Sequence, residues 1–138
     1  MLKTFESVKF QHMAHDQHAH LIHEVGEMLA PVLSKSPQGV YIYLDDAHKT
    51  CNKKYAQMLG YKSVKEWVDN EYPIDDVDPK DQPKGIKAYM NASEKLTAGV
   101  QTATFIKKGG KKFKAEIIMV PFTYKNEVFV LSFITPKS

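Results

Sequence analysis

The sequence contains no arginine: all 19 basic residues are lysine, and the formal net charge is only +3. Bidentate recognition of guanine or phosphate relies mainly on arginine. This composition therefore argues against specific nucleic-acid binding. A lysine-rich surface in contact with water accounts for the charge without any partner.

Cysteine is almost absent, since Cys51 is the only one. A disulfide framework or a thiolate zinc cluster is thereby excluded. No apolar run approaches the roughly 20 residues of a membrane span, and the N-terminus lacks the apolar core of a signal peptide. We therefore expect a cytoplasmic protein with no membrane segment. Its 138 residues are enough for one domain with a core of its own.

The common catalytic motifs are also missing. The chain has no phosphate loop, no dinucleotide-binding glycine fingerprint, no Gly-x-Ser-x-Gly elbow and no His-Glu-x-x-His zinc motif. We therefore expect a protein that is not an enzyme.

Residues 1–35 and 36–138 differ in pattern, and we divide the chain between them. The first part carries five of the six histidines and has the periodicity of a helix. The border, residues 34–39, is rich in turn and breaker residues. We expect an N-terminal amphipathic helical extension followed by one α+β domain.

The expected helix has an apolar face and a face rich in histidine. Pro31 should end or kink it at Ala30. Such a helix needs a cover, which is either the domain's own sheet or a second copy of the helix in a homodimer. His18 falls within the apolar stripe and is interpreted as a packed histidine at that interface. At about 100° per residue, the stripe contains Ala14, Leu21, Ile22, Val25, Met28 and Leu29.

The polar face of this helix permits an alternative function, the binding of a divalent metal such as nickel, copper or zinc. Histidines three residues apart on a helix can reach the same ion. His12 and His23 cannot share an ion, because eleven residues span about 16 Å at 1.5 Å per residue. One helix therefore offers at most two partial sites, and a partner helix would have to complete each. The other interpretation is a solvated face of histidine–carboxylate pairs. The candidate ligands are His12, His15, His20, His23, Glu24 and Glu27.

Residues 36–138 carry strand and helix signals in the order β-β-α-α-α-β-β-β. Asn52 and Ser63 are expected N-caps of two short helices, and Gly60 fits the position just after a helix. Residues 72–83 are expected to form an irregular loop, followed by a helix over 84–96. The expected strands cover residues 39–44, 48–51, 101–107, 113–119 and 128–134.

Several motifs within this order resemble the PAS (Per-Arnt-Sim) sensor domain. Residues 52–61 are similar to its Asn-x-x-aromatic-x-x-x-Leu-Gly-Tyr segment, and residues 77–81 resemble its His-Pro-x-Asp loop, with Asp78 in place of the histidine. Residues 105–110 resemble its basic hairpin, and residues 132–135 its closing Asp-Ile-Thr, with Phe133 in place of the aspartate. The resemblance covers residues 36–135.

This resemblance implies a five-stranded antiparallel sheet with flanking short helices and a pocket between them. It implies sensing or protein interaction, with a homodimer, a separate output protein or an unknown small ligand as partner. A flavin photoreceptor is not expected, because Cys51 lies outside the flavin-binding motif. Haem is not expected either. The chain has no Cys-x-x-Cys-His motif to bind haem covalently and no histidine within residues 84–96 to bind it non-covalently. The expected pocket residues are Tyr41, Tyr43, Tyr55, Met58, Trp67, Tyr89, Phe105, Met119 and Phe133.

Overall fold

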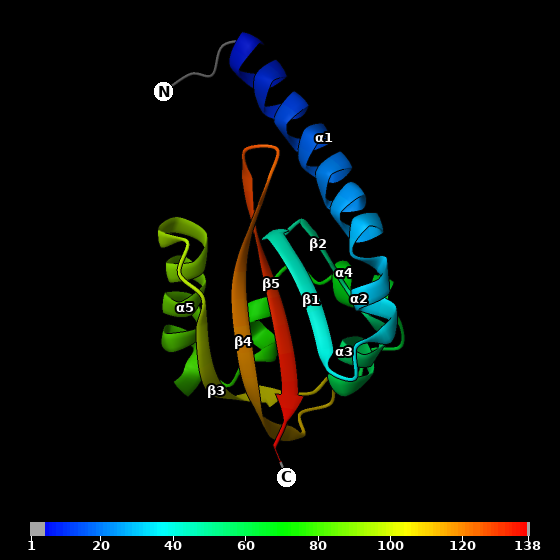
Figure 1. Ribbon diagram of the computed structural model, residues 1–138, viewed down its shortest axis with the longest axis vertical. Coiled ribbons are helices and arrows are strands. Elements are labelled where there is room, and N and C mark those ends of the chain that lie inside the picture. The colour runs from blue at the N-terminus through cyan, green and yellow to red at the C-terminus, as the bar shows by residue number, and fades with distance from the viewer. Residues whose placement is uncertain (1–4, 138) are drawn as a thin grey trace.

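The computed structural model describes residues 5–137, with side chains from residue 17 to residue 137. Five antiparallel strands form one sheet in the order β2-β1-β5-β4-β3, and helices lie on both of its faces (Figure 1). The predicted α+β class and the five-stranded antiparallel sheet are therefore confirmed. The strands are β1 (Gly39–Asp45), β2 (His48–Cys51), β3 (Gly99–Ile106), β4 (Lys112–Tyr124) and β5 (Glu127–Pro136).

The helical segments follow the predicted order, with one difference in the loop before the last helix. This loop contains two short 3₁₀ helices, η1 (Pro73–Asp76) and η2 (Pro79–Asp81), each begun by a proline whose fixed φ suits a first helical turn. The α-helices are α1 (Phe5–Met28), α2 (Ala30–Lys35), α3 (Lys53–Met58), α4 (Val64–Val68) and α5 (Gln82–Lys95).

Asn52 joins the start of α3 to the first strand. Its Oδ1 accepts the backbone N–H of Tyr55 at 2.9 Å, as an N-cap does, and that of Val40 at 3.0 Å. Its Nδ2 donates to the carbonyl of Gln38 at 3.0 Å. The side chain is only 5% exposed, so the three hydrogen bonds are made inside the protein. The cap predicted from the sequence thus also fixes the position of α3 on the sheet.

The aspartates of the loop before α5 bind the free edge of the sheet. The backbone N–H of Asp78 donates to the carbonyl of Thr104 in β3 at 2.9 Å. The N–H of Thr104 in turn donates to Oδ2 of Asp81 at 2.8 Å. Edge strands expose unpaired backbone groups, and these two contacts satisfy a donor and an acceptor on β3. They also hold the loop beside the inner face of the sheet.

Strand alternation divides the apolar residues between two faces of the sheet. The inner face, with Ala115, Ile117 and Ile134, forms a core with α3, α4 and α5. The outer face, with Ile42, Leu44 and Phe129, forms a second cluster with Leu21 and Val25 of α1. Each face of the sheet is therefore covered by helices of the same chain.

Helix α1 lies on the outer face, and its N-terminal half extends beyond the end of the sheet (Figure 1). Leu21 is 2% exposed and Val25 is fully buried, so the sheet covers the middle of the predicted apolar stripe. Met28 is an exception: it is 49% exposed, because it lies at the last turn of the helix and is not part of the outer cluster. Ala14, also assigned to the stripe, lies outside the residues whose side chains are described.

The helix ends where Pro31 was expected to interrupt it. α1 stops at Met28, Leu29 forms a turn, and α2 begins at Ala30 with the proline in its first turn. The amides of Leu29 and Leu33 still bond four residues back, to Val25 and Leu29. Within residues 5–137, no helix is both long and apolar enough to cross a membrane.

Candidate functional site

A cavity of about 450 Å³ lies between the inner face of the sheet, α5 and the loop that precedes α5. This size falls within the range of small-molecule sites, about 300 to 1,000 Å³. Ile86 and Met90 of α5 line it although they are 50% and 47% exposed, so the cavity opens to solvent beside this helix. The sheet contributes Tyr41, Tyr43, Gln101, Ala103, Phe105, Ile117, Met119 and Val130, and the helices contribute Tyr55, Trp67, Ile86, Tyr89, Met90, Ser93 and Glu94.

The structure gathers most of the expected pocket residues around this cavity. Met58 and Phe133 do not line it. Met58 packs on the rim of the inner core beside Gly39. Phe133 alternates with Ser132 and Ile134 along β5, so it shares the outer face with Phe129. The expected residues that do line the cavity are Tyr41, Tyr43, Tyr55, Trp67, Tyr89, Phe105 and Met119.

The polar groups of the cavity are mostly neutral. Burial raises the pKa values of Tyr41, Tyr55 and Tyr89, so their hydroxyls stay protonated near neutral pH. The charged side chains in the lining are carboxylates, Asp46 and Glu94, and no lysine or histidine of residues 17–137 contributes to it. A wall of this composition favours a neutral or cationic ligand over an anion.

Gln101 supplies an unused hydrogen-bond donor. It lines the cavity from β3, and its buried Nε2 atom has no hydrogen-bond partner among the described residues. Buried amide groups are normally paired, because an unpaired one costs about 1 to 3 kcal/mol. A ligand oxygen is the kind of partner this position lacks. Sequence reasoning missed Gln101, although its alternation with Ala103 and Phe105 along the expected strand could have identified it.

The turn between β1 and β2 joins this cavity to the outer face of the sheet. The Tyr43 hydroxyl donates to Oδ1 of Asp46 at 2.5 Å, and both residues line the cavity. The preceding residue, Asp45, lies toward α1, where its Oδ2 is 3.0 Å from Nδ1 of His18. Two adjacent aspartates thus contact the cavity wall and the N-terminal helix.

The buried lysine of β2 was also missed by sequence reasoning. Lys49 is 3% exposed, and its Nζ donates to the carbonyls of Asp46, Val68 and Asn70 at 2.5, 2.8 and 2.7 Å. Burial lowers the pKa of Lys49, and the nearby aspartates oppose this. The ammonium group ties the β1–β2 turn to the end of α4, next to the cavity.

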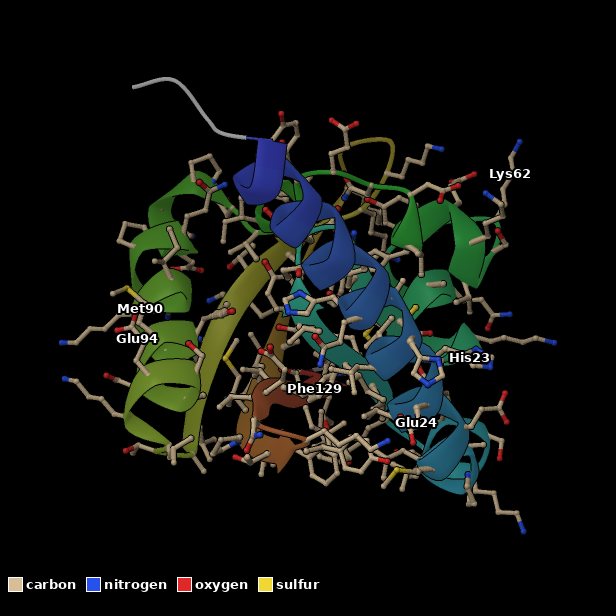
Figure 2. The ribbon with its side chains drawn as sticks, turned by 90° about the horizontal axis from the view of Figure 1, so that it is seen from above. His23, Glu24, Lys62, Met90, Glu94 and Phe129 are labelled. Carbon is tan, nitrogen blue, oxygen red and sulfur yellow. The ribbon has the colours of Figure 1, made fainter. Side chains whose placement is uncertain are left out.

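Two of the histidines expected as metal ligands, His20 and His23, lie on the solvent side of α1. Their side chains are 74% and 73% exposed, and each lies 3.9 Å from a glutamate four residues on, Glu24 and Glu27 respectively. His23 and Glu24 both project from α1 (Figure 2). Glu24 also accepts the Tyr124 hydroxyl at 2.7 Å. These side chains form pairs, as the solvated-face interpretation expects. His12 and His15 lie outside the residues whose side chains are described, and metal binding at this face stays a prediction.

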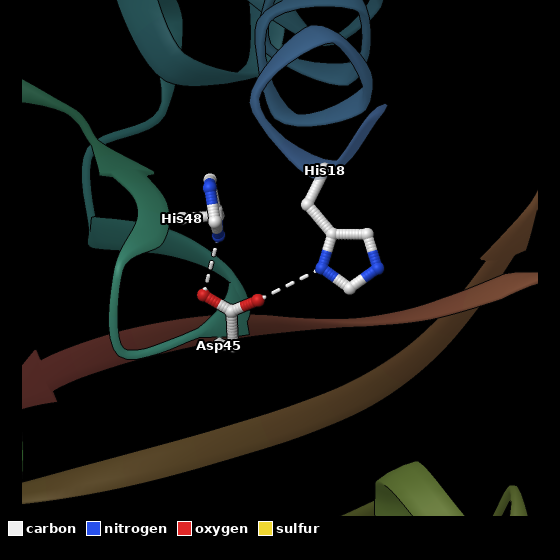
Figure 3. Close-up of side chains that lie close together, drawn as sticks. All are labelled: His18, Asp45 and His48. Atoms are coloured by element: carbon white, nitrogen blue, oxygen red, sulfur yellow. Dashed lines mark hydrogen bonds and ion pairs between the residues drawn. The ribbon is translucent and has the colours of Figure 1, made fainter. Parts of the chain in front are cut away.

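A different set of possible metal ligands comes together on the inner side of α1. His18, Asp45 and His48 offer nitrogen and oxygen atoms that all lie within 4.8 Å of one another (Figure 3). His18 had been interpreted as a packed interface residue, and its partners could not be predicted, since they lie 27 or more positions away along the chain. The only signal in the sequence was the position of His18 within the apolar stripe of its helix, which indicated a buried polar contact.

Comparison with solved structures identifies the fold. A PAS domain from a protein of Colwellia psychrerythraea aligns with a TM-score of 0.66 and 16% identity over 82% of this chain and 97% of that one. The PAS domain of a two-component sensor histidine kinase gives 0.62 and 15%, over 83% and 99%. That of the fruit-fly ELK potassium channel gives 0.62 and 13%, over 80% and 94%. No protein-family model and no curated protein sequence matches the chain.

The chain has the fold of a PAS domain, as its motifs had suggested. Its neighbours come from proteins as different as a sensor kinase and an ion channel. Since fold does not fix function, identities of 13–16% identify no shared ligand.

Proposed function

We propose that the protein is a non-enzymatic sensor that binds one small molecule in the cavity between the sheet and α5. The ligand is neutral or cationic, with an aromatic or aliphatic body and an oxygen that accepts a hydrogen bond. The observation that carries this proposal is the buried Nε2 atom of Gln101, which has no hydrogen-bond partner among residues 17–137 and lines a largely apolar cavity of about 450 Å³. Apolar walls with a few placed polar groups are typical of ligand sites.

The mechanism we propose is a population shift passed through the β1–β2 turn. A ligand that reaches Tyr43 and Asp46 competes with their mutual hydrogen bond. A movement of the turn would displace Asp45 and so change its contact with His18 of α1. Ligand binding would then favour one packing of α1 on the sheet, to the extent that the ligand binds that packing more tightly.

The test uses a pair of variants on the same strand. Ala103→Phe adds a ring inside the cavity, whereas Val100→Phe adds the same ring at a position that is 65% exposed and outside the lining. The probes are native mass spectrometry for copurified ligand and thermal-shift screening with a library of neutral aromatic compounds and amines. Retained mass or thermal stabilisation should occur in the wild type and Val100→Phe and be lost in Ala103→Phe.

Gln101→Leu provides the second comparison. The substitution removes an unpaired polar group, so stability should hold or rise, while affinity for the identified compound should fall about fivefold to a hundredfold for one lost hydrogen bond. If neither mass spectrometry nor the screen finds a ligand for the wild type, the sensor proposal fails. A PAS fold that acts only as an interaction adaptor would then be the better interpretation.

A further inference from the structure

Four side chains from three distant segments meet between α1 and the end of the sheet. His18 comes from α1, Asp45 and His48 flank the β1–β2 turn, and Glu127 begins β5 after the turn from β4. Nδ1 of His18 lies 3.0 Å from Oδ2 of Asp45, and Nδ1 of His48 lies 2.7 Å from Oδ1 of the same carboxylate (Figure 3). Nε2 of His18 lies 3.2 Å from Oε1 of Glu127.

The donor set suits a first-row transition metal ion. Two imidazole nitrogens and one carboxylate oxygen are the ligand types of zinc sites that have three ligands from the protein and a fourth position open to water or substrate. Ligand atoms around a tetrahedral zinc lie about 3.3 Å apart, given bonds of about 2.0–2.1 Å. The candidate atoms of His18, Asp45 and His48 already lie within 4.8 Å of one another.

Glu127 would not bind the metal itself but would hold the ring of His18 in place, as an outer partner of the site. Metal-bound histidines usually donate their second ring N–H to a carboxylate, which fixes the ring and its tautomer. His18 meets this condition, since Asp45 faces its Nδ1 and Glu127 faces its Nε2. His48 is held more firmly, because it is only 6% exposed and its ring contacts that of His18 edge-on at 5.6 Å.

The charges around the cluster also favour a cation. Asp45 and Glu127 bring two carboxylates against imidazoles that are neutral when they bind metal. Among the described residues, the nearby ammonium of Lys49 is directed at three backbone carbonyls, and Lys125 is bound to Glu24 at 2.9 Å. The His18 side chain is 27% exposed, so an ion can reach the cluster from solvent.

We propose that His18, Asp45 and His48 bind a divalent ion of the zinc type, with Glu127 orienting His18. The proposal goes beyond the cavity ligand, since this cluster lies on the other side of the β1–β2 turn. It differs from a site on the outer histidines of α1, because only His18 among its ligands belongs to that helix. Metal bound here fastens α1 to the sheet and stabilises the folded protein in proportion to its free concentration.

The experiment titrates zinc into tag-free, chelator-treated protein by calorimetry and follows the melting temperature in parallel. The wild type should bind one zinc per chain and melt at a higher temperature with zinc present. His18→Gln and Asp45→Asn should each lower zinc affinity at least about tenfold, and Glu127→Gln should lower it about tenfold to a hundredfold, as outer-partner substitutions do.

The matched control is the double variant His20→Gln, His23→Gln, which removes two exposed histidines from the same helix. It should retain the zinc affinity of the wild type. Circular dichroism and the melting temperature without zinc separate lost binding from lost folding. Cobalt absorption provides an independent readout, since the ligand-field bands of a bound, low-symmetry ion should disappear in His48→Gln.

Two outcomes overturn the proposal. One is a wild type that neither binds zinc in the titration nor gains thermal stability from it. The other is loss of binding in the His20, His23 variant with full binding in His18→Gln, which would assign the metal to the outer face of α1.

Discussion

Lys49 illustrates how a single residue can hold several segments in place. Its three carbonyl partners come from the β1–β2 turn and from the end of α4, and its Nζ also lies 5.5 Å from the centre of the Trp67 ring. Charges are seldom this buried unless they are fully hydrogen-bonded. The lysine therefore replaces the backbone pairing that these irregular segments lack.

Replacing this lysine should destabilise the protein although an apolar residue is introduced. Lys49→Met leaves three carbonyls without this donor, and we expect a loss of about 2 to 4 kcal/mol in the free energy of unfolding. Urea unfolding checks it, with Lys65→Met as control at a lysine whose side chain is 82% exposed. Equal stabilities for the two variants would contradict the structural role of Lys49.

Asp81 makes a pH-dependent contribution to stability. The hydrogen bond from the Thr104 N–H lowers the pKa of Asp81 in the folded state. The stabilisation by Asp81 is therefore complete above the pKa of an aspartate in the unfolded chain, about 3.9. It is lost as the pH falls through the lower pKa of Asp81 in the folded protein. Asp81→Asn keeps an acceptor oxygen but not the charge.

The expected result is a difference in unfolding free energy between wild type and Asp81→Asn that is constant near neutral pH. It should shrink below about pH 4, where the carboxylate of the unfolded chain becomes protonated. Chemical denaturation at a series of pH values measures it. A difference that stays the same down to pH 3 would show that the charge of Asp81 contributes nothing.

Contacts of single residues could be predicted from the sequence where the partner is close along the chain, but not where the partner is distant. The Asn52 cap follows from its place before an apolar helix, and its contact with Tyr55 was expected. Its second partner, Val40, comes from a strand twelve residues earlier. The meeting of His18 with Glu127 spans 109 positions, and no spacing rule reports on such a pair.

At the scale of elements, the main question left open by the sequence was what covers the helix over residues 5–28. The amphipathic pattern predicted that this helix needs a cover, either the domain's own sheet or a second copy of the helix. The structure shows that the protein's own sheet covers it, through Leu21 and Val25. Periodicity alone could not choose between a sheet and a second helix, since both present an apolar surface. Strand alternation, applied to β5, would have excluded Phe133 from the pocket.

Leu21→Ala tests the docking of α1 on its own sheet. Leu21 is 2% exposed against the outer cluster, so truncation should lower the free energy of unfolding by about 2 to 5 kcal/mol. Met28→Ala, at a position that is 49% exposed on the same helix, should stay within about 0.5 kcal/mol of the wild type. Thermal and urea unfolding should give the same order at two protein concentrations. A loss that appears only at high concentration would indicate that a second chain, not the sheet, covers Leu21.

At the scale of the whole molecule, the prediction that remains to be tested is the homodimer expected from the amphipathic helix. Since Leu21 and Val25 pack on the chain's own sheet, deleting the entire helix would expose Ile42, Leu44 and Phe129 and could cause association by itself. The informative truncation therefore begins at Gln17 and removes only the part of α1 that extends beyond the sheet (Figure 1). Phe10, Met13 and Ala14 in this part have the i, i+3, i+4 spacing of a helix-pairing face.

We expect the full chain to be a dimer and the chain beginning at Gln17 to be a monomer with unchanged secondary structure. Light scattering coupled to size exclusion measures the mass, and circular dichroism verifies the fold. The reason is that the truncation removes apolar side chains from the extended half of α1 and leaves the contacts of Leu21 and Val25 intact. A truncated protein that remains dimeric would assign dimerisation to another surface. A monomeric full chain would instead leave α1 with one role, which is to cover the outer face of its own sheet.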